Sequence, residues 1–179
     1  MKYQIFFIIV LFLSCFSNFS WAAETKDGVN HIELAAVMLK DGHHDRALLA
    51  LQSVDLGDKK TDLTRFYTLQ GLAYMGLNDL EAAKDSLQLA IKNGQKDPAI
   101  YIYLAQSYFG LKDYQKTIDA IQKAGNQVNK NPSLLSMKAE SYWHLQDVNA
   151  AINALNEGQR LFPADFRFQK RQVFYFVEL

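Results

Sequence analysis

Apolar residues recur at helical spacing along the chain from about residue 30 onward, and the whole pattern repeats about every 34 residues. Each copy places small residues at fixed positions, with a tyrosine shortly after the first of them. In the best three copies these two positions are Gly71 with Tyr74, Ala105 with Tyr108, and Ala139 with Tyr142. The spacing predicts a hairpin of two α-helices in each copy, with the small residues where helices approach closely.

Further columns keep the same register in all three copies. They are Ala83, Thr117 and Ala151; Leu87, Ile121 and Leu155; and Ala90, Ala124 and Gly158. The turn between the two helices of a copy is represented by Gly76-Leu77-Asn78-Asp79. In this turn the glycine is expected to free the backbone at the helix end, and Asp79 to cap the next helix.

The segments that begin at Gly71, Ala105 and Ala139 resemble the tetratricopeptide repeat (TPR) family, and a weaker copy containing Ala35 and Ala47 precedes them. The resemblance implies an all-α fold, a right-handed superhelical α-solenoid of TPR helix hairpins. The expected divisions are a degenerate repeat at 29–60, repeats at 61–96, 97–130 and 131–163, and a last segment at 164–179.

The last segment is expected to begin another first helix over 165–177, with Phe166, Val173 and Phe176 in core-like places. Two interpretations are open: the helix caps the fourth unit, or it is the start of a truncated further repeat. The second is favoured because Leu179 matches the leucine that precedes each earlier turn.

Residues 1–22 have the three parts of a secretory signal peptide. Lys2 provides a positive start, 5–16 is an apolar stretch, and the Ser-Trp-Ala sequence at 20–22 is a small-x-small cleavage site. The apolar stretch is short for a membrane span, so an uncleaved anchor is an alternative to cleavage, and lipidation of Cys15 is another. Exported proteins that resemble this family are commonly periplasmic, so the expected location is the bacterial periplasm.

Charge and candidate chemistry argue against several other function classes. The chain has 19 basic and 19 acidic residues, and its basic runs are pairs such as Lys170-Arg171, so no nucleic-acid partner is expected. We interpret His43-His44-Asp45 as a solvated turn, because a structural metal site needs three or four converging ligands. No hydrolase motif and no complete phosphate-binding loop occur in the sequence. We therefore expect no enzyme activity, no cofactor and no bound metal.

In stacked helix hairpins the first helix of each pair lines the concave surface. Residues spaced i, i+4 and i+7 that packing does not require then form one stripe on each first helix. The predicted partner-binding groove consists of Arg65, Thr68, Leu72 and Met75; Ile102, Gln106 and Phe109; and Ser136, Glu140 and Trp143. Members of the family that bind a partner's terminal carboxylate look built around lysines and asparagines on this concave surface. The three stripes contain neither residue type.

Met75, Phe109 and Trp143 occupy equivalent places at one end of the groove, and two interpretations fit them. As an exposed apolar row, they would anchor a helix or an extended peptide of a partner protein. As core residues, they would pack against the following turn or under the next repeat. The pattern alone does not decide between groove and core.

The leading hypothesis is a non-catalytic exported scaffold that binds another envelope protein, in assembly or transport of an envelope or surface structure. The alternative is the N-terminal TPR part of a larger polysaccharide or protein secretion apparatus. The identity of the partner and the oligomeric state stay open, since repeat architecture indicates binding without naming what is bound.

Overall fold

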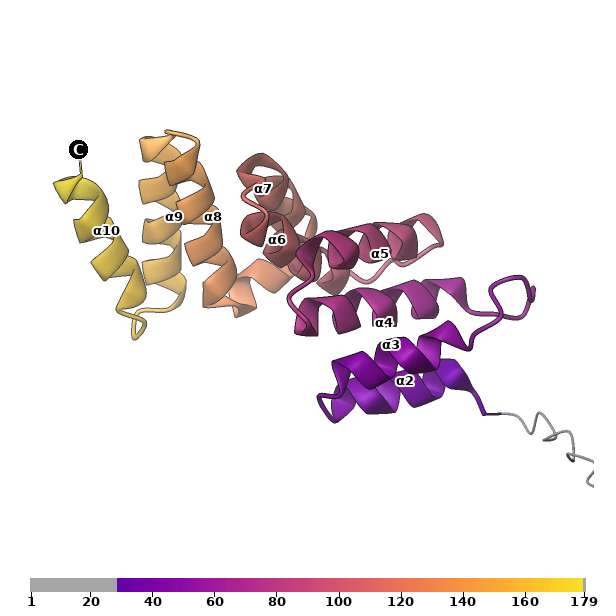
Figure 1. Cartoon of the computed structure of the whole chain (residues 1–179). Coiled ribbons are helices and arrows are strands. Elements are labelled where there is room, and N and C mark those ends of the chain that lie inside the picture. Colours follow the sequence, from indigo (N-terminus) through magenta and orange to yellow (C-terminus); the bar gives the residue numbers. More distant parts are fainter. Residues whose placement is uncertain (1–28, 179) are drawn as a thin grey trace, which may run out of the picture. The chain divides into compact units, whose positions relative to one another are not determined.

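The computed structural model of the chain describes residues 29–178. The predicted signal peptide, Cys15 and Leu179 lie outside the described residues. The α-helices of the described part are α2 (His31–Lys40), α3 (His44–Gln52), α4 (Leu63–Gly76), α5 (Leu80–Lys92), α6 (Ala99–Gly110), α7 (Tyr114–Lys123), α8 (Pro132–His144), α9 (Val148–Leu161) and α10 (Arg167–Val177), with the short 3-10 helix η1 (Gly125–Lys130) after α7 (Figure 1). Between residues 29 and 178 there is no β-strand.

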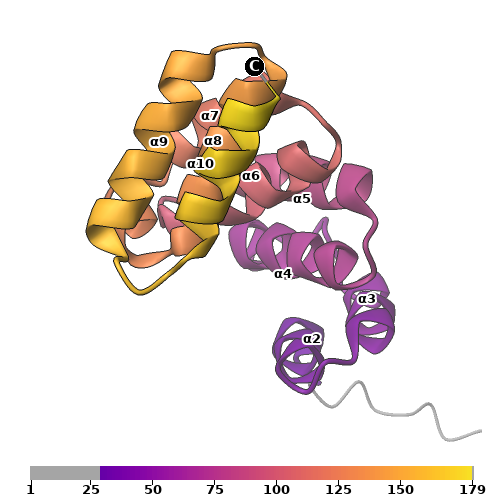
Figure 2. The same ribbon diagram turned by 90° about the vertical axis from the view of Figure 1, so that its left-hand side faces the viewer.

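Consecutive helices pack as hairpins, α2 with α3, α4 with α5, α6 with α7 and α8 with α9 (Figure 1). Each second helix also packs against the first helix of the next hairpin, and α9 packs against α10 in the same way (Figure 2). The first helices α2, α4, α6 and α8 contact one another in turn. The predicted all-α solenoid of helix hairpins is therefore confirmed for the described residues.

The small residues lie where the helices come closest. Ala35, Ala105 and Ala139 are fully buried, and Gly71 takes the same place in α4. A Cβ atom on Gly71 would lie 2.7 Å from Cγ of Leu87, which is well inside van der Waals contact. Small side chains at this column thus set the distance between the two helices of a hairpin.

Asp79 caps the second helix of its hairpin as predicted, and Asp113 and Asp147 do the same in the next two hairpins. Each carboxylate accepts a hydrogen bond from the backbone N–H three residues later. The residue before each aspartate has a left-handed backbone; these residues are Asn78, Lys112 and Gln146, with φ of 60°, 61° and 63°. The backbone N–H of each aspartate also bonds to a carbonyl of the preceding helix, which completes a Schellman turn. The same aspartate therefore ends one helix and begins the next.

The prediction that glycine frees the backbone in these turns was wrong. Gly76 has no left-handed conformation, because the left-handed residue is Asn78. A Cβ atom on Gly76 would instead overlap the imidazole ring of His44, the first residue of α3. His44 is half-buried, so the interpretation of residues 43–45 as a solvated turn was wrong for this side chain. The glycine is needed for close packing between neighbouring hairpins.

The same contact recurs along the array between the end of each first helix and the start of the preceding second helix. The sizes of the two contacting residues differ from unit to unit. In the fourth unit His144 takes the place of the glycine, and its ring stacks on that of Tyr114 with 4.3 Å between the ring centroids. The pairs are Gly76 with His44, Gly110 with Leu80, and His144 with Tyr114.

Replacing Asp113 with alanine should lower the free energy of unfolding by about 1 kcal/mol, the usual cost of losing a helix N-cap. Asp113 also pairs with Lys116, with 2.7 Å between Oδ2 and Nζ, and this hydrogen bond lowers the pKa of the carboxyl group. Asp113→Asn keeps the capping oxygen but loses the ion pair, and should therefore cost less than the alanine variant. Urea unfolding followed by circular dichroism measures both. Equal losses would mean that the ion pair, and not the cap, is the stabilising part.

The orientation of α10 differs from the prediction. Phe166, Val173 and Phe176 were expected in core-like places but are 70%, 63% and 60% exposed. Phe168 and Tyr175 are buried instead, at 1% and 0% exposure. In the repeat register Val173 is equivalent to Gly71, Ala105 and Ala139. Residues at this position contact the second helix of the same hairpin. Within residues 29–178 no second helix follows α10, so this face stays exposed.

None of the helices between residues 29 and 178 is both long and apolar enough to cross a membrane.

Candidate functional site

The predicted groove residues lie on α4, α6 and α8, the first helices of three consecutive hairpins. Arg65 is exposed, and the other nine side chains are half-buried. Half-burial is compatible both with packing between repeats and with contact to a partner. The individual contacts of each stripe therefore carry more information than its burial.

The polar residues at the start of the α4 stripe already have partners within the chain. Both guanidinium nitrogens Nη1 and Nη2 of Arg65 donate to the Glu33 carboxylate of α2, at 2.5 and 2.7 Å. The Thr68 hydroxyl donates to the carbonyl of Thr64 at 2.7 Å and accepts from Nε2 of Gln95 at 3.2 Å. These groups connect neighbouring helices and loops, so a ligand would have to compete with bonds that already exist.

The three bulky residues contact different neighbours. Met75 packs against the larger of the two hydrophobic clusters, here called the main core, whose buried residues run from Leu87 to Tyr175. Phe109 meets the ring of Tyr114 edge-on, with 6.0 Å between centroids. Trp143 stacks on Tyr175 of α10, with 4.0 Å between centroids and 1° between planes. Phe109 and Trp143 therefore make contacts of the kind expected if they are core residues, which pack against the following turn or under the next repeat.

Of the remaining predicted residues, Leu72 and Gln106 are half-buried, and Ile102 packs against the main core. Glu140 lies opposite α10, and its Oε2 is 2.9 Å from Nη2 of Arg171. Ser136 lines a cleft between α8 and α10. The α8 stripe thus lies beside the charged side chains of α10.

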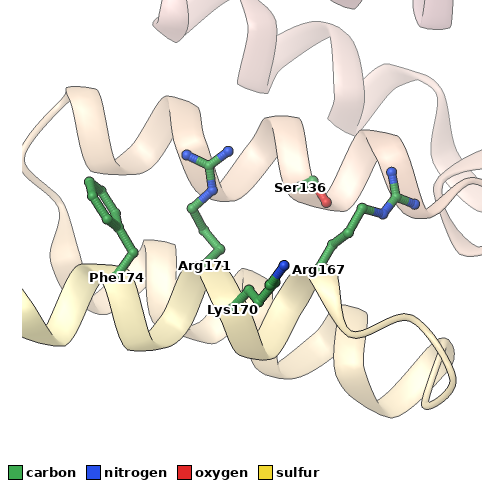
Figure 3. A pocket seen from close by; sticks show the side chains of 5 residues that line it. All are labelled: Ser136, Arg167, Lys170, Arg171 and Phe174. Carbon is green, nitrogen blue, oxygen red and sulfur yellow. The ribbon is translucent and has the colours of Figure 1, made fainter.

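This cleft has a volume of about 450 Å³ and is lined by Ser136 from α8 and by Arg167, Lys170, Arg171 and Phe174 from α10. Figure 3 shows the two arginines extending from α10 toward the helix that carries Ser136, with Phe174 at the other end of the cleft. Three cationic side chains at i, i+3 and i+4 share one face of a helix. The cleft is therefore basic on its α10 side.

Two of the three cations are paired. Arg167 donates from Nε to Asp165 at 2.9 Å, and this hydrogen bond raises the pKa of Arg167 and lowers that of Asp165. Arg171 pairs with Glu140. In the part of the chain that the structure describes, the Lys170 ammonium group and the Ser136 hydroxyl have no hydrogen-bond or ion-pair partner.

The basic side of the cleft was not predicted from the sequence, because Lys170-Arg171 was considered there only as evidence against a nucleic-acid partner. The repeat register could have revealed this basic side, because adding one repeat length to the positions of the α8 stripe gives positions on α10. Ser136 and Glu140 correspond to Lys170 and Phe174 in that register. Extending the stripes by one more unit would have placed the lysine beside the serine.

Comparisons with known proteins agree with the repeat architecture. Residues 64–93 match the model of the tetratricopeptide repeat, and residues 85–158 match the model of the anaphase-promoting complex (cyclosome) subunit 3. No curated protein matches the chain.

Solved structures of MamA proteins have a similar fold. The structure named MamA MSR-1 is 14% identical, with a TM-score of 0.71 over 83% of this chain and 84% of that chain. MamA AMB-1 is also 14% identical, with a TM-score of 0.73 over 83% and 80%. MamA from Desulfovibrio magneticus RS-1 is 16% identical, with a TM-score of 0.71 over 84% and 86%. At these identities the likeness concerns the fold. Together with the matched repeat model and the stacked helix hairpins, it identifies the chain as a tetratricopeptide repeat protein.

Proposed function

We propose that this protein is an exported, non-catalytic scaffold of the bacterial cell envelope, which binds a segment of another envelope protein during assembly or transport of a surface structure. The observation that carries the proposal is the succession of first helices α4, α6 and α8, which contact one another and present half-buried side chains at equivalent places. A TPR array is an interaction scaffold, and such a succession offers a long surface to a helical or extended segment.

The envelope location is supported by the composition of residues 1–22, with a lysine, an apolar stretch and a small-x-small site. A second candidate function is the TPR part of a larger apparatus that secretes polysaccharide or protein. In that case the array would position a membrane channel, and a channel sequence would be encoded in the same gene.

Site-specific photocrosslinking in the native cell tests the groove. A photoreactive residue at Gln106, a half-buried groove position on α6, should crosslink a defined envelope protein. The same residue at Gln122, an exposed position on the second helix α7, is the matched control and should not. The mass of the crosslinked chain also reports whether residues 1–22 have been removed. Equal crosslinking at both positions would argue against a groove on the first helices.

A further inference from the structure

The cleft between α8 and α10 differs from the rest of the groove, because it combines a basic side with polar groups that have no partner within the described residues. Arg167, Lys170 and Arg171 provide three positive charges, and Asp165 and Glu140 provide two negative ones. One positive charge is therefore in excess, and it belongs to Lys170. The Ser136 hydroxyl lies across the cleft from it (Figure 3).

We infer that this cleft binds an acidic side chain of the partner segment, an inference that rests on the proposed function of the groove. The carboxylate would be held by the Lys170 ammonium and the Ser136 hydroxyl. It would also meet guanidinium N–H groups that the existing ion pairs leave unused, since a guanidinium has five donors. Arg171 uses only Nη2 toward Glu140, and Arg167 uses Nε and Nη2 toward Asp165. Hydrogen bonds to a carboxylate from such cationic donors are roughly twice as strong as neutral ones.

The shape of the cleft favours a peptide over a single ion. Lys170 and Phe174 are about one helical turn apart on α10, a rise of about 6 Å. Phe174 is 48% exposed, so one end of the cleft offers an apolar surface. In an extended peptide, residues i and i+2 lie about 7 Å apart and point to the same side. A glutamate followed two residues later by leucine therefore matches the charge at one end and the phenylalanine at the other.

The charge of the cleft argues against nucleic acid as its ligand. Affinity for nucleic acid comes mainly from many phosphate contacts along a basic stripe. Here two of the cations are already paired with carboxylates, and the chain as a whole has equal numbers of basic and acidic residues. One free ammonium beside a hydroxyl suits one carboxylate.

Binding of a labelled, amidated peptide with a central Glu-Ser-Leu sequence to the full chain tests the inference. The unaltered protein should bind it in a salt-dependent manner, and the Gln-Ser-Leu peptide should bind about tenfold more weakly, as expected when one charge-assisted hydrogen bond is lost. Lys170→Glu should reduce affinity at least as much, whereas Lys170→Arg should retain it. Lys60→Glu makes the same change of charge in an exposed loop and is the matched control.

The inference is overturned if the glutamate peptide does not bind at millimolar concentration, or if Lys170→Glu and Lys60→Glu have the same affinity for it. If the glutamine peptide binds only when its C-terminus is a free carboxylate, the cleft binds the end of a chain. That result would overturn the inference that it binds an acidic side chain. Crosslinking at Gln106 separates the two levels of the proposal. If the Lys170→Glu variant gives the same crosslink yield as the unaltered protein, the partner-binding groove is supported and the acidic ligand of the cleft is rejected. If the unaltered protein gives no crosslink, the proposed groove is rejected.

Discussion

Replacing Tyr175 with alanine is expected to destabilise the C-terminal helices by about 3 to 5 kcal/mol, the usual cost of deleting a buried aromatic side chain. Tyr175 is fully buried, and its ring lies parallel to that of Trp143. Each repeat contacts mainly its neighbours, so the loss should appear first as undocking of α10 rather than as unfolding of the whole array. Hydrogen exchange of the α10 amides, compared with those of α4, measures it.

Tyr175→Phe provides the control, because it keeps the ring and removes the hydroxyl. The Tyr175 hydroxyl is buried without a hydrogen-bond partner in the described structure, and burial raises its pKa to about 12. A buried polar group without a partner costs about 1 to 3 kcal/mol, so the phenylalanine variant should be at least as stable as the original protein. If phenylalanine were as damaging as alanine, the hydroxyl and not the aromatic stack would secure α10.

Replacing Gly158 with alanine is expected to destabilise the protein by about 1 to 3 kcal/mol through overpacking. Gly158 lies inside α9, where alanine would otherwise be the better helix former by about 1 kcal/mol. A Cβ atom at this position would lie 2.6 Å from Cζ of the buried Phe168 ring and would overlap its Cε1. Urea unfolding, or hydrogen exchange in α9 and α10, gives the size of the loss. Gly158→Ala at unchanged or raised stability would contradict this packing.

A second substitution tests the cause of that loss. The repeat register pairs a small residue at the end of each second helix with a larger one at the start of the next first helix. These pairs are Ala90 with Ile100, Ala124 with Leu134, and Gly158 with Phe168. Gly158→Ala combined with Phe168→Leu recreates the pair of the preceding unit. The double variant should be more stable than the sum of the two single changes predicts, by about 1 to 2 kcal/mol, because the two side chains are in contact.

Much of the fold could be predicted because it depends on contacts that recur in each unit. The tyrosine and small-residue columns indicated helix hairpins, and Asp79 was identified as a helix cap, as the structure shows. Both signals are local: a cap needs one side chain and the next turn of helix, and a buried face needs only the helical period. Local signals of this kind do not depend on the rest of the molecule.

The candidate site was harder to predict, since it depends on what lies opposite each side chain. Ser136 and Glu140 were identified as groove residues, but their basic neighbours on α10 were not. Arg65 and Glu33 form an ion pair between different hairpins, and the sequence around either residue does not indicate this pairing. The bulky side chain of Trp143 was compatible with a groove and with a core, and its stack on Tyr175 became visible only once α10 was placed.

By itself, the sequence determined the repeat, the helix hairpins, the capping aspartates and the small residues at helix crossings, because each of these follows from a periodic pattern of side-chain size and polarity. The tertiary structure alone decided which face of α10 is buried, why Gly76 packs as a glycine against His44, and where Lys170 faces Ser136 without either having a partner among residues 29–178. Those features arise between hairpins, where the partner of a residue is set by three-dimensional stacking and not by its neighbours along the chain.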